Sequence, residues 1–196
     1  MNRFQIILLF LLLTNAVFGQ KKRDTLIYNL PVVNDKLIYE GSRSVIGRNR
    51  AELDTLAKNW YFTYFKNSQI NEKKNPLITT GTDTSSFLLN RGVILFHVKP
   101  GLINISFLAL IRVKVTCTDF HYSYKIDSIL FRPQNNTLNA LGYQNDPEYL
   151  IKIYKRKHLG LSTAMDVTRG QIREYLSKMN ATIRECIASL NKAMAN

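Results

Sequence analysis

The stretch from Ile103 to Cys117, INISFLALIRVKVTC, decides the fold. In an extended chain alternate side chains point to opposite faces, and every odd-numbered position here is apolar or Cys. The even-numbered positions change from Leu108 and Leu110 to Arg112, Lys114, Thr116 and Thr118. This pattern predicts a long antiparallel strand with one buried face and an opposite face that becomes wet along its length.

Shorter patterns on either side of this stretch predict the rest of a sheet. Residues Thr118 to His121 are expected to form a hairpin turn, after which Tyr122 to Phe131 returns as a strand. Three earlier strands are predicted, and these are Lys36 to Ser42, Leu77 to Thr82 and Val93 to Val98, with a turn at Gly81 to Ser86. Because the strands are adjacent in sequence, an antiparallel meander is expected.

A helix is predicted to begin after Asn49, since Glu52 stands at the spacing of a capping box. Its apolar residues recur at helical spacing, and they are Leu53, Leu56, Ala57, Trp60 and Tyr64. We interpret Trp60 as a core anchor. An aromatic ligand platform formed with Tyr61 and Tyr64 is the alternative.

A second, longer helix is predicted at the C-terminal end. Its apolar stripe consists of Ile172, Leu176, Met179, Ile183, Ile187, Leu190 and Met194. The stripe can lie across the sheet or pair with a second copy as a coiled coil, and we favour the sheet. A short helix is expected at Pro147 to Tyr154, within an otherwise irregular segment.

The first residues have the pattern of a signal peptide, with Arg3 followed by the apolar run Phe4 to Leu13 and small residues up to Gly19. Cleavage is expected near Gly19, and the chain is expected to be exported to the periplasm or cell envelope. A retained anchor is the alternative, although the apolar run is short for a span. The expected organisation is a signal peptide at 1–19, a flexible lead-in at 20–29, an α+β sheet domain at 30–132, an irregular basic segment at 133–160 and a C-terminal helix at 161–196 that packs on the same domain.

The chain is basic, with 27 Lys and Arg against 14 Asp and Glu and a formal net charge of +13. Such a balance normally raises nucleic acid as a partner. An exported chain meets anionic glycans, lipid headgroups and acidic proteins instead. We therefore expect an anionic envelope partner and no nucleic acid, with surplus charge that serves only solubility as the alternative.

The sequence shows no constellation that predicts catalysis, a cofactor or a metal ion. It lacks the GxSxG and GxGxxG patterns, and its three His have no metal-ligand spacing. Cys117 with His97 or His121 is the sole nucleophile and base pair that can be named, and a small buried residue on a sheet face is the alternative for Cys117. In an oxidising compartment Cys117 and Cys186 are a possible disulfide, and two buried thiols are the equal alternative.

One candidate ligand site follows from the predicted hairpin. Tyr122 and Tyr124 stand at alternate positions beside Arg112 and Lys114 of the neighbouring strand. These four residues are predicted to form an aromatic and basic patch on one sheet face. Ordinary cross-strand packing is the alternative.

Three short motifs resemble a family of exported bacterial proteins of unknown function. They are K-x-x-Y-x-G at Lys36, Tyr39 and Gly41, A-K-x-W at Ala57, Lys58 and Trp60, and Y-x-Y-x-I at Tyr122, Tyr124 and Ile126. The family is described as having a fold like that of the TATA-box-binding protein (TBP-like), and the resemblance covers residues 30–132. It implies a curved antiparallel sheet with helices on one side, and it carries no catalytic residues across. Members often turn through Asp-Gly in the late hairpin, whereas this chain has no Gly from Thr118 to His121.

The sequence therefore predicts an α+β, TBP-like domain, with about five strands in a curved antiparallel sheet and an early and a long C-terminal helix packed on one face. The expected function is non-catalytic binding or scaffolding in the cell envelope, through the sheet face that the helices leave open. The alternatives are an envelope hydrolase with an unrecognised active site and a structural protein that oligomerises through its long helix.

Overall fold

A computed structural model describes residues 29–66, 78–82, 85–99, 104–134, 146–155 and 169–196. The expected signal peptide at 1–19 lies outside this part of the chain, as does most of the lead-in. Much of the basic segment at 133–160 also lies outside it. Within the described residues, no helix combines the length and the apolar character that crossing a membrane would need.

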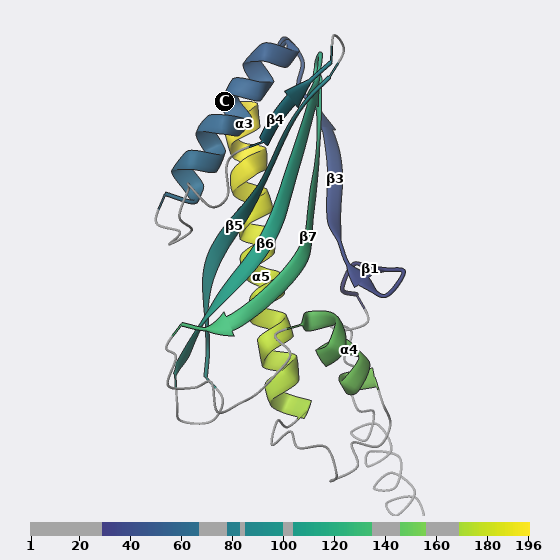
Figure 1. Cartoon of the computed structure of the whole chain (residues 1–196), viewed down its shortest axis with the longest axis vertical. Helices are drawn as coiled ribbons and strands as arrows, with labels where there is room; N and C mark the ends of the chain where they lie inside the picture. The colour runs from purple at the N-terminus through teal and green to yellow at the C-terminus, as the bar shows by residue number, and fades with distance from the viewer. Residues whose placement is uncertain (1–28, 67–77, 83–84, 100–103, 135–145, 156–168) are drawn as a thin grey trace, which may run out of the picture.

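The core of the fold is a five-stranded antiparallel sheet with the strand order β3-β7-β6-β5-β4. The strands are β3 (Tyr39–Ser44), β4 (Ile78–Gly81), β5 (Ser86–Val98), β6 (Ile105–Thr118) and β7 (His121–Pro133). Strands β4 to β7 form the expected meander. Strand β3 departs from it, because it pairs with β7 at the far edge and the chain then crosses to β4 (Figure 1).

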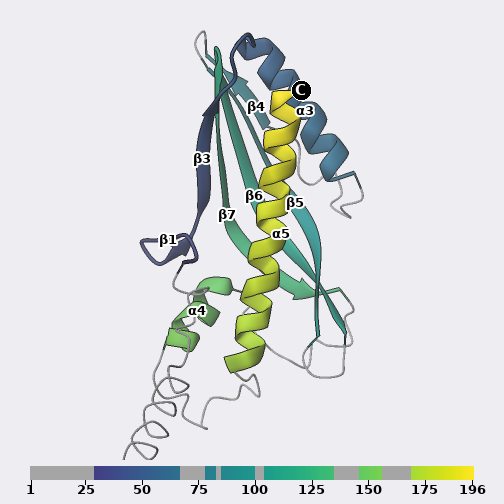
Figure 2. The same ribbon diagram turned by 180° about the vertical axis from the view of Figure 1, so that it is seen from behind.

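Two helices cover one face of this sheet. Helix α3 (Arg50–Tyr64) carries the chain from the β3 edge toward β4, and α5 (Arg169–Ala195) runs along the sheet beside it. Figure 1 shows the strands in front of α5, and Figure 2 shows α5 in front of the strands. The predicted fold class is confirmed: an early helix and a long C-terminal helix pack on one face of a five-stranded antiparallel sheet.

The apolar stripe of α5 is buried within the chain itself. Its buried residues are Ile172, Tyr175, Leu176, Met179, Ile183, Cys186, Leu190 and Met194. Among the residues predicted for the stripe, Ile187 is only partly buried. Because the sheet already takes up this stripe, no equivalent apolar seam on α5 is left for a coiled coil.

Two small elements lie below the β3 edge. A two-stranded hairpin is formed by β1 (Val32–Val33) and β2 (Lys36–Leu37), and Asn34 and Asp35 turn between them with positive φ. Helix α4 (Pro147–Lys155) packs nearby. The Glu148 carboxylate of α4 accepts the backbone N–H of Leu37 at 2.8 Å, which ties this helix to the hairpin.

The start of α3 follows the capping box that the sequence predicts. The Asn49 side chain accepts the N–H of Glu52, and the Glu52 carboxylate accepts the N–H of Asn49. The β6–β7 turn adds a further acceptor, because the Asp119 carboxylate accepts the N–H of Arg50 at 2.8 Å. Both interactions satisfy backbone donors that have no partner in the first turn of a helix.

Strand β5 begins at Ser86 and not at Val93, so the prediction was wrong for its first half. The inward positions there include Ser86, Asn90 and Gly92, which lack the apolar alternation of a half-buried strand. The ring of Phe65 at the end of α3 fills the space above Gly92, where an added Cβ would overlap it. The buried volume is thus supplied by the helix, and local periodicity does not reveal the strand.

A β-bulge at Ser128 divides β7. Its φ is +51°, and the register with β6 shifts between Leu110 and Arg112. As a result Ile126 and Ile129 are both buried, although simple alternation would place them on opposite faces. Asp127, before the bulge, points to the open face with its partner Arg112.

The tight β6–β7 turn contains strain that can be tested. Phe120 has φ +60° and its side chain is 56% exposed. Left-handed backbone costs a residue with a Cβ about 1–2 kcal/mol. We expect Phe120→Gly to raise the free energy of unfolding by about 1 kcal/mol, measured by urea denaturation.

Phe120→Ala is the matched control, because it removes the ring and keeps the Cβ. It is expected to give no gain in stability. If both variants lower the free energy of unfolding to the same extent, the Phe120 ring stabilises the turn by more than the backbone strain costs.

Candidate functional site

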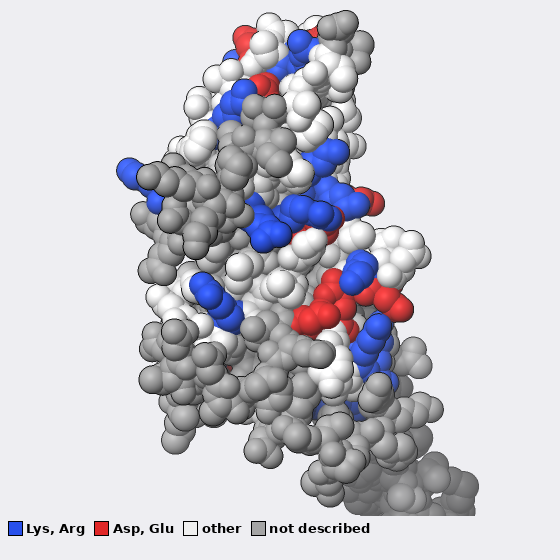
Figure 3. All heavy atoms as spheres, in the orientation of Figure 1, with Lys and Arg blue, Asp and Glu red and all other residues white. Residues whose placement is uncertain are grey.

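The sheet face opposite α3 and α5, which we call the open face, brings together charged residues that are far apart in the sequence. Its outward-pointing cations on the described strands are Arg91, Arg112, Lys114, Lys125 and Arg132. The outward-pointing carboxylates on the same strands are Glu40 and Asp127, and Asp146 and Glu148 lie beside Arg112 and Asp127. Figure 3 shows Lys and Arg side chains as a band across this face. We call Arg91, Arg112, Lys114 and Lys125 the cation band.

The strand register places like charges opposite each other within the cation band. Arg91 of β5 is the cross-strand partner of Arg112 of β6. Lys114 of β6 is the partner of Lys125 of β7. Partners in an antiparallel pair lie on the same face about 5 Å apart, and like charges at such positions are destabilising. The band is therefore a surface on which cations are concentrated at a cost in stability.

One of the four cations is neutralised within the protein. The Arg112 guanidinium donates two hydrogen bonds to the Asp127 carboxylate, at 2.5 and 2.7 Å. This arrangement lowers the pKa of Asp127 and raises the pKa of Arg112. Lys125 reaches the same carboxylate at 4.0 Å. Arg112 is therefore engaged by Asp127.

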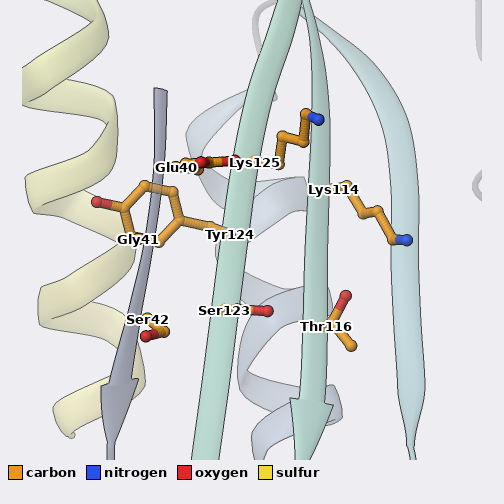
Figure 4. A pocket seen from close by; sticks show the side chains of 8 residues that line it. All are labelled: Glu40, Gly41, Ser42, Lys114, Thr116, Ser123, Tyr124 and Lys125. Atoms are coloured by element: carbon orange, nitrogen blue, oxygen red, sulfur yellow. The ribbon is translucent and has the colours of Figure 1, made fainter. Parts of the chain in front are cut away.

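A hollow of about 440 Å³ lies at the β3 side of the cation band. Six of its lining residues form two rows, a charged row of Glu40, Lys125 and Lys114 and a hydroxyl row of Ser42, Ser123 and Thr116. Gly41 and Tyr124 also line it. Figure 4 shows that the Lys114 and Lys125 side chains leave neighbouring strands and diverge. The Lys114 ammonium lies over the Phe87 ring, 4.8 Å from its centre.

The predicted patch of Arg112, Lys114, Tyr122 and Tyr124 is not formed. Arg112 and Lys114 are exposed on the open face, but Tyr122 is paired with Cys117 and Tyr124 with Val115 on the helix-covered face. The reason is that antiparallel partners share a face. The buried Tyr122 hydroxyl donates to the side chain of Asn191 of α5 at 2.7 Å, so this tyrosine is a packing residue.

Sequence reasoning missed several residues of the open face. They are Glu40, Ser42, Phe87, Arg91, Ser123, Lys125 and Asp127. The hairpin turn contained the signal for the β7 members, because it places Thr118 opposite His121 and so fixes Lys114 opposite Lys125. No comparable signal exists for Arg91, since its register with β6 follows from a connection that includes residues outside the described part.

The motifs behind the family resemblance pack against one another. Tyr39 is the partner of Ile126, and Gly41 is the partner of Tyr124. The Tyr39 hydroxyl donates to the Asn180 side chain of α5 at 2.9 Å. The ring of Tyr124 lies over Gly41, where an added Cβ would be 2.6 Å from its hydroxyl oxygen. These residues join β3 to β7 and to α5.

Trp60 of the second motif is a residue of α3 at its contact with α5, and it is 4% exposed. Its indole N–H donates to the Ser189 hydroxyl of α5 at 3.3 Å. The Tyr64 ring stacks on it with 5.8 Å between ring centres. These contacts support the interpretation of Trp60 as a core anchor, and Trp60 and Tyr64 also line a hollow of about 540 Å³.

Cys117 and Cys186 are both free, buried thiols in the structure. Cys117 faces the covered side of β6, and Cys186 lies on α5 beside Tyr64. Burial raises the pKa of each thiol to about 12. A thiol that stays protonated is a poor nucleophile, which argues against Cys117 as a catalytic residue.

The histidines and acids give no metal centre in the described part of the chain, where no group of three or more potential metal-ligating His, Cys, Asp or Glu side chains occurs. His97 is on the open face, with its Nδ1 2.9 Å from the Ser106 hydroxyl. This arrangement is that of a surface hydrogen bond.

The fold and the motif packing define the class of this domain as α+β and TBP-like. The chain is similar to the crystal structure of a TBP-like protein from Parabacteroides distasonis ATCC 8503, with a TM-score of 0.56 and 14% identity over 85% of this chain and 97% of that one. It is also similar to the structure of a DUF4468 family protein from Bacteroides ovatus ATCC 8483, with a TM-score of 0.62 and 15% identity over 90% of this chain and 97% of that one.

These two structures confirm the resemblance to a bacterial family of unknown function with a TBP-like fold. At such identities the similarity concerns the fold. No protein-family model matches the chain, and no curated protein matches it.

The contact between Gly41 and Tyr124 makes a prediction about stability. Gly41→Ala is expected to lower the free energy of unfolding by about 1–3 kcal/mol, because its Cβ overlaps the Tyr124 ring. Tyr124→Ala removes the obstacle. Urea denaturation of the double variant is expected to show a smaller loss than the two single losses added together. Strict additivity would mean that the ring moves aside without cost.

The buried thiols make a second prediction. Native protein at pH 8 is expected to react with a thiol-specific reagent about a hundredfold more slowly than protein in guanidinium chloride, because both pKa values are near 12 and both side chains are buried. The denatured chain is the control for reagent activity. Failure of the denatured, unreduced chain to react would reveal a disulfide.

Proposed function

We propose that this chain is an exported, non-catalytic binding domain whose open sheet face takes up an anionic ligand in the cell envelope. The observation that carries the proposal is the opposition of Arg91 to Arg112 and of Lys114 to Lys125 across neighbouring strands. The pattern of residues 1–19 supports export.

The energetics favour a ligand over a purely solubilising role. Lys114 and Lys125 are like charges at directly opposed positions, which is destabilising in the free protein, whereas Asp127 offsets the charge of Arg112 in the other pair. Charges that serve solubility alone can be spread over the surface, where this cost is absent. An anion above the band attracts both members of a pair at once. Its binding therefore relieves the repulsion between the two cations.

The kinds of residue on the open face also favour binding over catalysis. The candidate nucleophile Cys117 lies on the opposite face, buried under the helices. The open face offers cations, hydroxyls and partly exposed leucines such as Leu95 and Leu130. Such a surface holds a ligand by charge and hydrogen bonds, with apolar contact beside them.

The proposal predicts that reversal of two cations on the open face weakens anion binding. The full chain with Arg91→Glu and Lys114→Glu is expected to bind immobilised dextran sulfate at least about tenfold more weakly than the unaltered chain, since each reversed charge repels the polymer. Biolayer interferometry measures the affinity, and a thermal melt checks that the variant folds. Affinity of the unaltered chain is expected to fall with salt.

The matched control changes the net charge equally on the other side of the molecule. Lys178 and Lys192 are exposed on α5, and Lys178→Glu with Lys192→Glu is expected to retain most of the affinity. Equal losses in both double variants would show that only the overall positive charge matters, and would contradict a binding face on the sheet.

A further inference from the structure

We propose that the 440 Å³ hollow between β3, β7 and β6 is a binding site for the phosphate group of a phosphate monoester. The inference rests on the proposed function of the open face and deepens it by naming a ligand group and its place. The residues that recognise the group are Lys114, Lys125, Thr116 and Ser123.

The register places these four residues next to one another on the open face of β6 and β7, at the corners of a rectangle. Lys114 stands opposite Lys125, and Thr116 stands opposite Ser123 one step further along the same strands. Same-face neighbours along a strand are two residues, or about 7 Å, apart. The two lysines therefore stand on one side of the hollow and the two hydroxyl residues on the other, and the lysine side chains extend toward β6 and β5 (Figure 4).

This arrangement of donors suits a tetrahedral oxyanion better than a carboxylate. Each ammonium has three N–H donors, and each hydroxyl has one O–H donor. A phosphate monoester presents three terminal oxygens in different directions, so it can accept from both rows at once. A flat carboxylate has two oxygens and reaches one row well.

The size of the hollow agrees with this choice. The hollow is larger than a single phosphate group and falls in the size range of small-ligand sites, which leaves room for the organic part of an ester. The lysine side chains diverge in the free protein (Figure 4). An anion between them turns the repulsion of Lys114 and Lys125 into attraction to a shared partner.

Glu40 allows a test in which the direction of the change in affinity is predicted, because it lines the same hollow and is the cross-strand partner of Lys125. Its negative charge opposes an incoming phosphate. Glu40→Gln is therefore expected to strengthen phosphate binding. If the hollow instead binds a neutral sugar or a cation, loss of this carboxylate weakens binding.

The experiment titrates the full chain with sn-glycerol 3-phosphate at constant low ionic strength, with isothermal titration calorimetry as the measurement. Lys114→Gln and Lys125→Gln are each expected to raise the dissociation constant about tenfold, as loss of a hydrogen bond to a charged group does. Glu40→Gln is expected to lower it severalfold. Glycerol is the uncharged control ligand and is expected to give no heat of binding.

Lys178→Gln is the matched protein control, because Lys178 is exposed on α5 and belongs neither to the cation band nor to the hollow. It is expected to change the affinity for glycerol 3-phosphate less than twofold. No saturable binding to the unaltered chain overturns the site, and so does weaker binding by Glu40→Gln or an equal loss in all three cation variants. Each variant is checked by thermal melting.

The source of the phosphate is distinguished by a second arm with vesicles of phosphatidylcholine and phosphatidic acid, whose headgroup is also a phosphate monoester. Binding to both probes, with loss in Lys125→Gln, supports the site and a lipid source. Binding to glycerol 3-phosphate alone supports the site and a soluble source. If neither probe binds while dextran sulfate does, the phosphate site is wrong and the proposed function of the open face stands.

Discussion

The structure depends on the burial of one face of β6 under α5 and α3. Seven consecutive inward positions of this central strand, from Ile105 to Cys117, are at most 8% exposed. At about 25 cal/mol per Å² of apolar area, such burial is the dominant favourable contribution to folding. The covering helices fix the inward face of β6. Because opposed residues in antiparallel strands share a face, they also fix the inward faces of β5 and β7.

The open face is a consequence of the same constraint. Once the apolar positions of β6 face the helices, its even-numbered positions must face away, and there the sequence places Arg112 and Lys114. The turn before β7 then decides which side chains meet them. The two-residue turn sets both Lys125 opposite Lys114 and Asp127 opposite Arg112, and the bulge shifts the register only beyond Asp127. The site is therefore determined by strand register.

The sequence predicted most of the fold because its strongest patterns lie where burial is strongest. The alternation in β6, the capping box at Asn49 and the stripe of α5 each depend on residues close in sequence. The first half of β5 escaped prediction because Phe65, from α3, fills the space above Gly92. Periodicity within a segment cannot show volume that another segment supplies.

The candidate site was predicted less well than the fold. Arg112 and Lys114 were placed correctly on the wet face of β6, but Tyr122 and Tyr124 were assigned to that face from proximity alone. The two tyrosines pair with Cys117 and Val115, which are inward positions of β6. The register of the predicted turn therefore already placed both tyrosines on the covered face. The contribution of β5 depends on a register between strands whose connection includes residues outside the described part.

The pairing of β3 with β7 also determines the order in which this molecule can fold. Tyr39 and Ile126 are adjacent in the sheet although most of the sheet-forming chain lies between them. Part of the cover for the apolar face comes later still, in α5, whereas α3 precedes β6 in the chain. Contacts between such distant segments make folding slow compared with that of helical bundles of the same size. A nascent chain therefore has only α3 to cover the apolar face of β6 until α5 has been made.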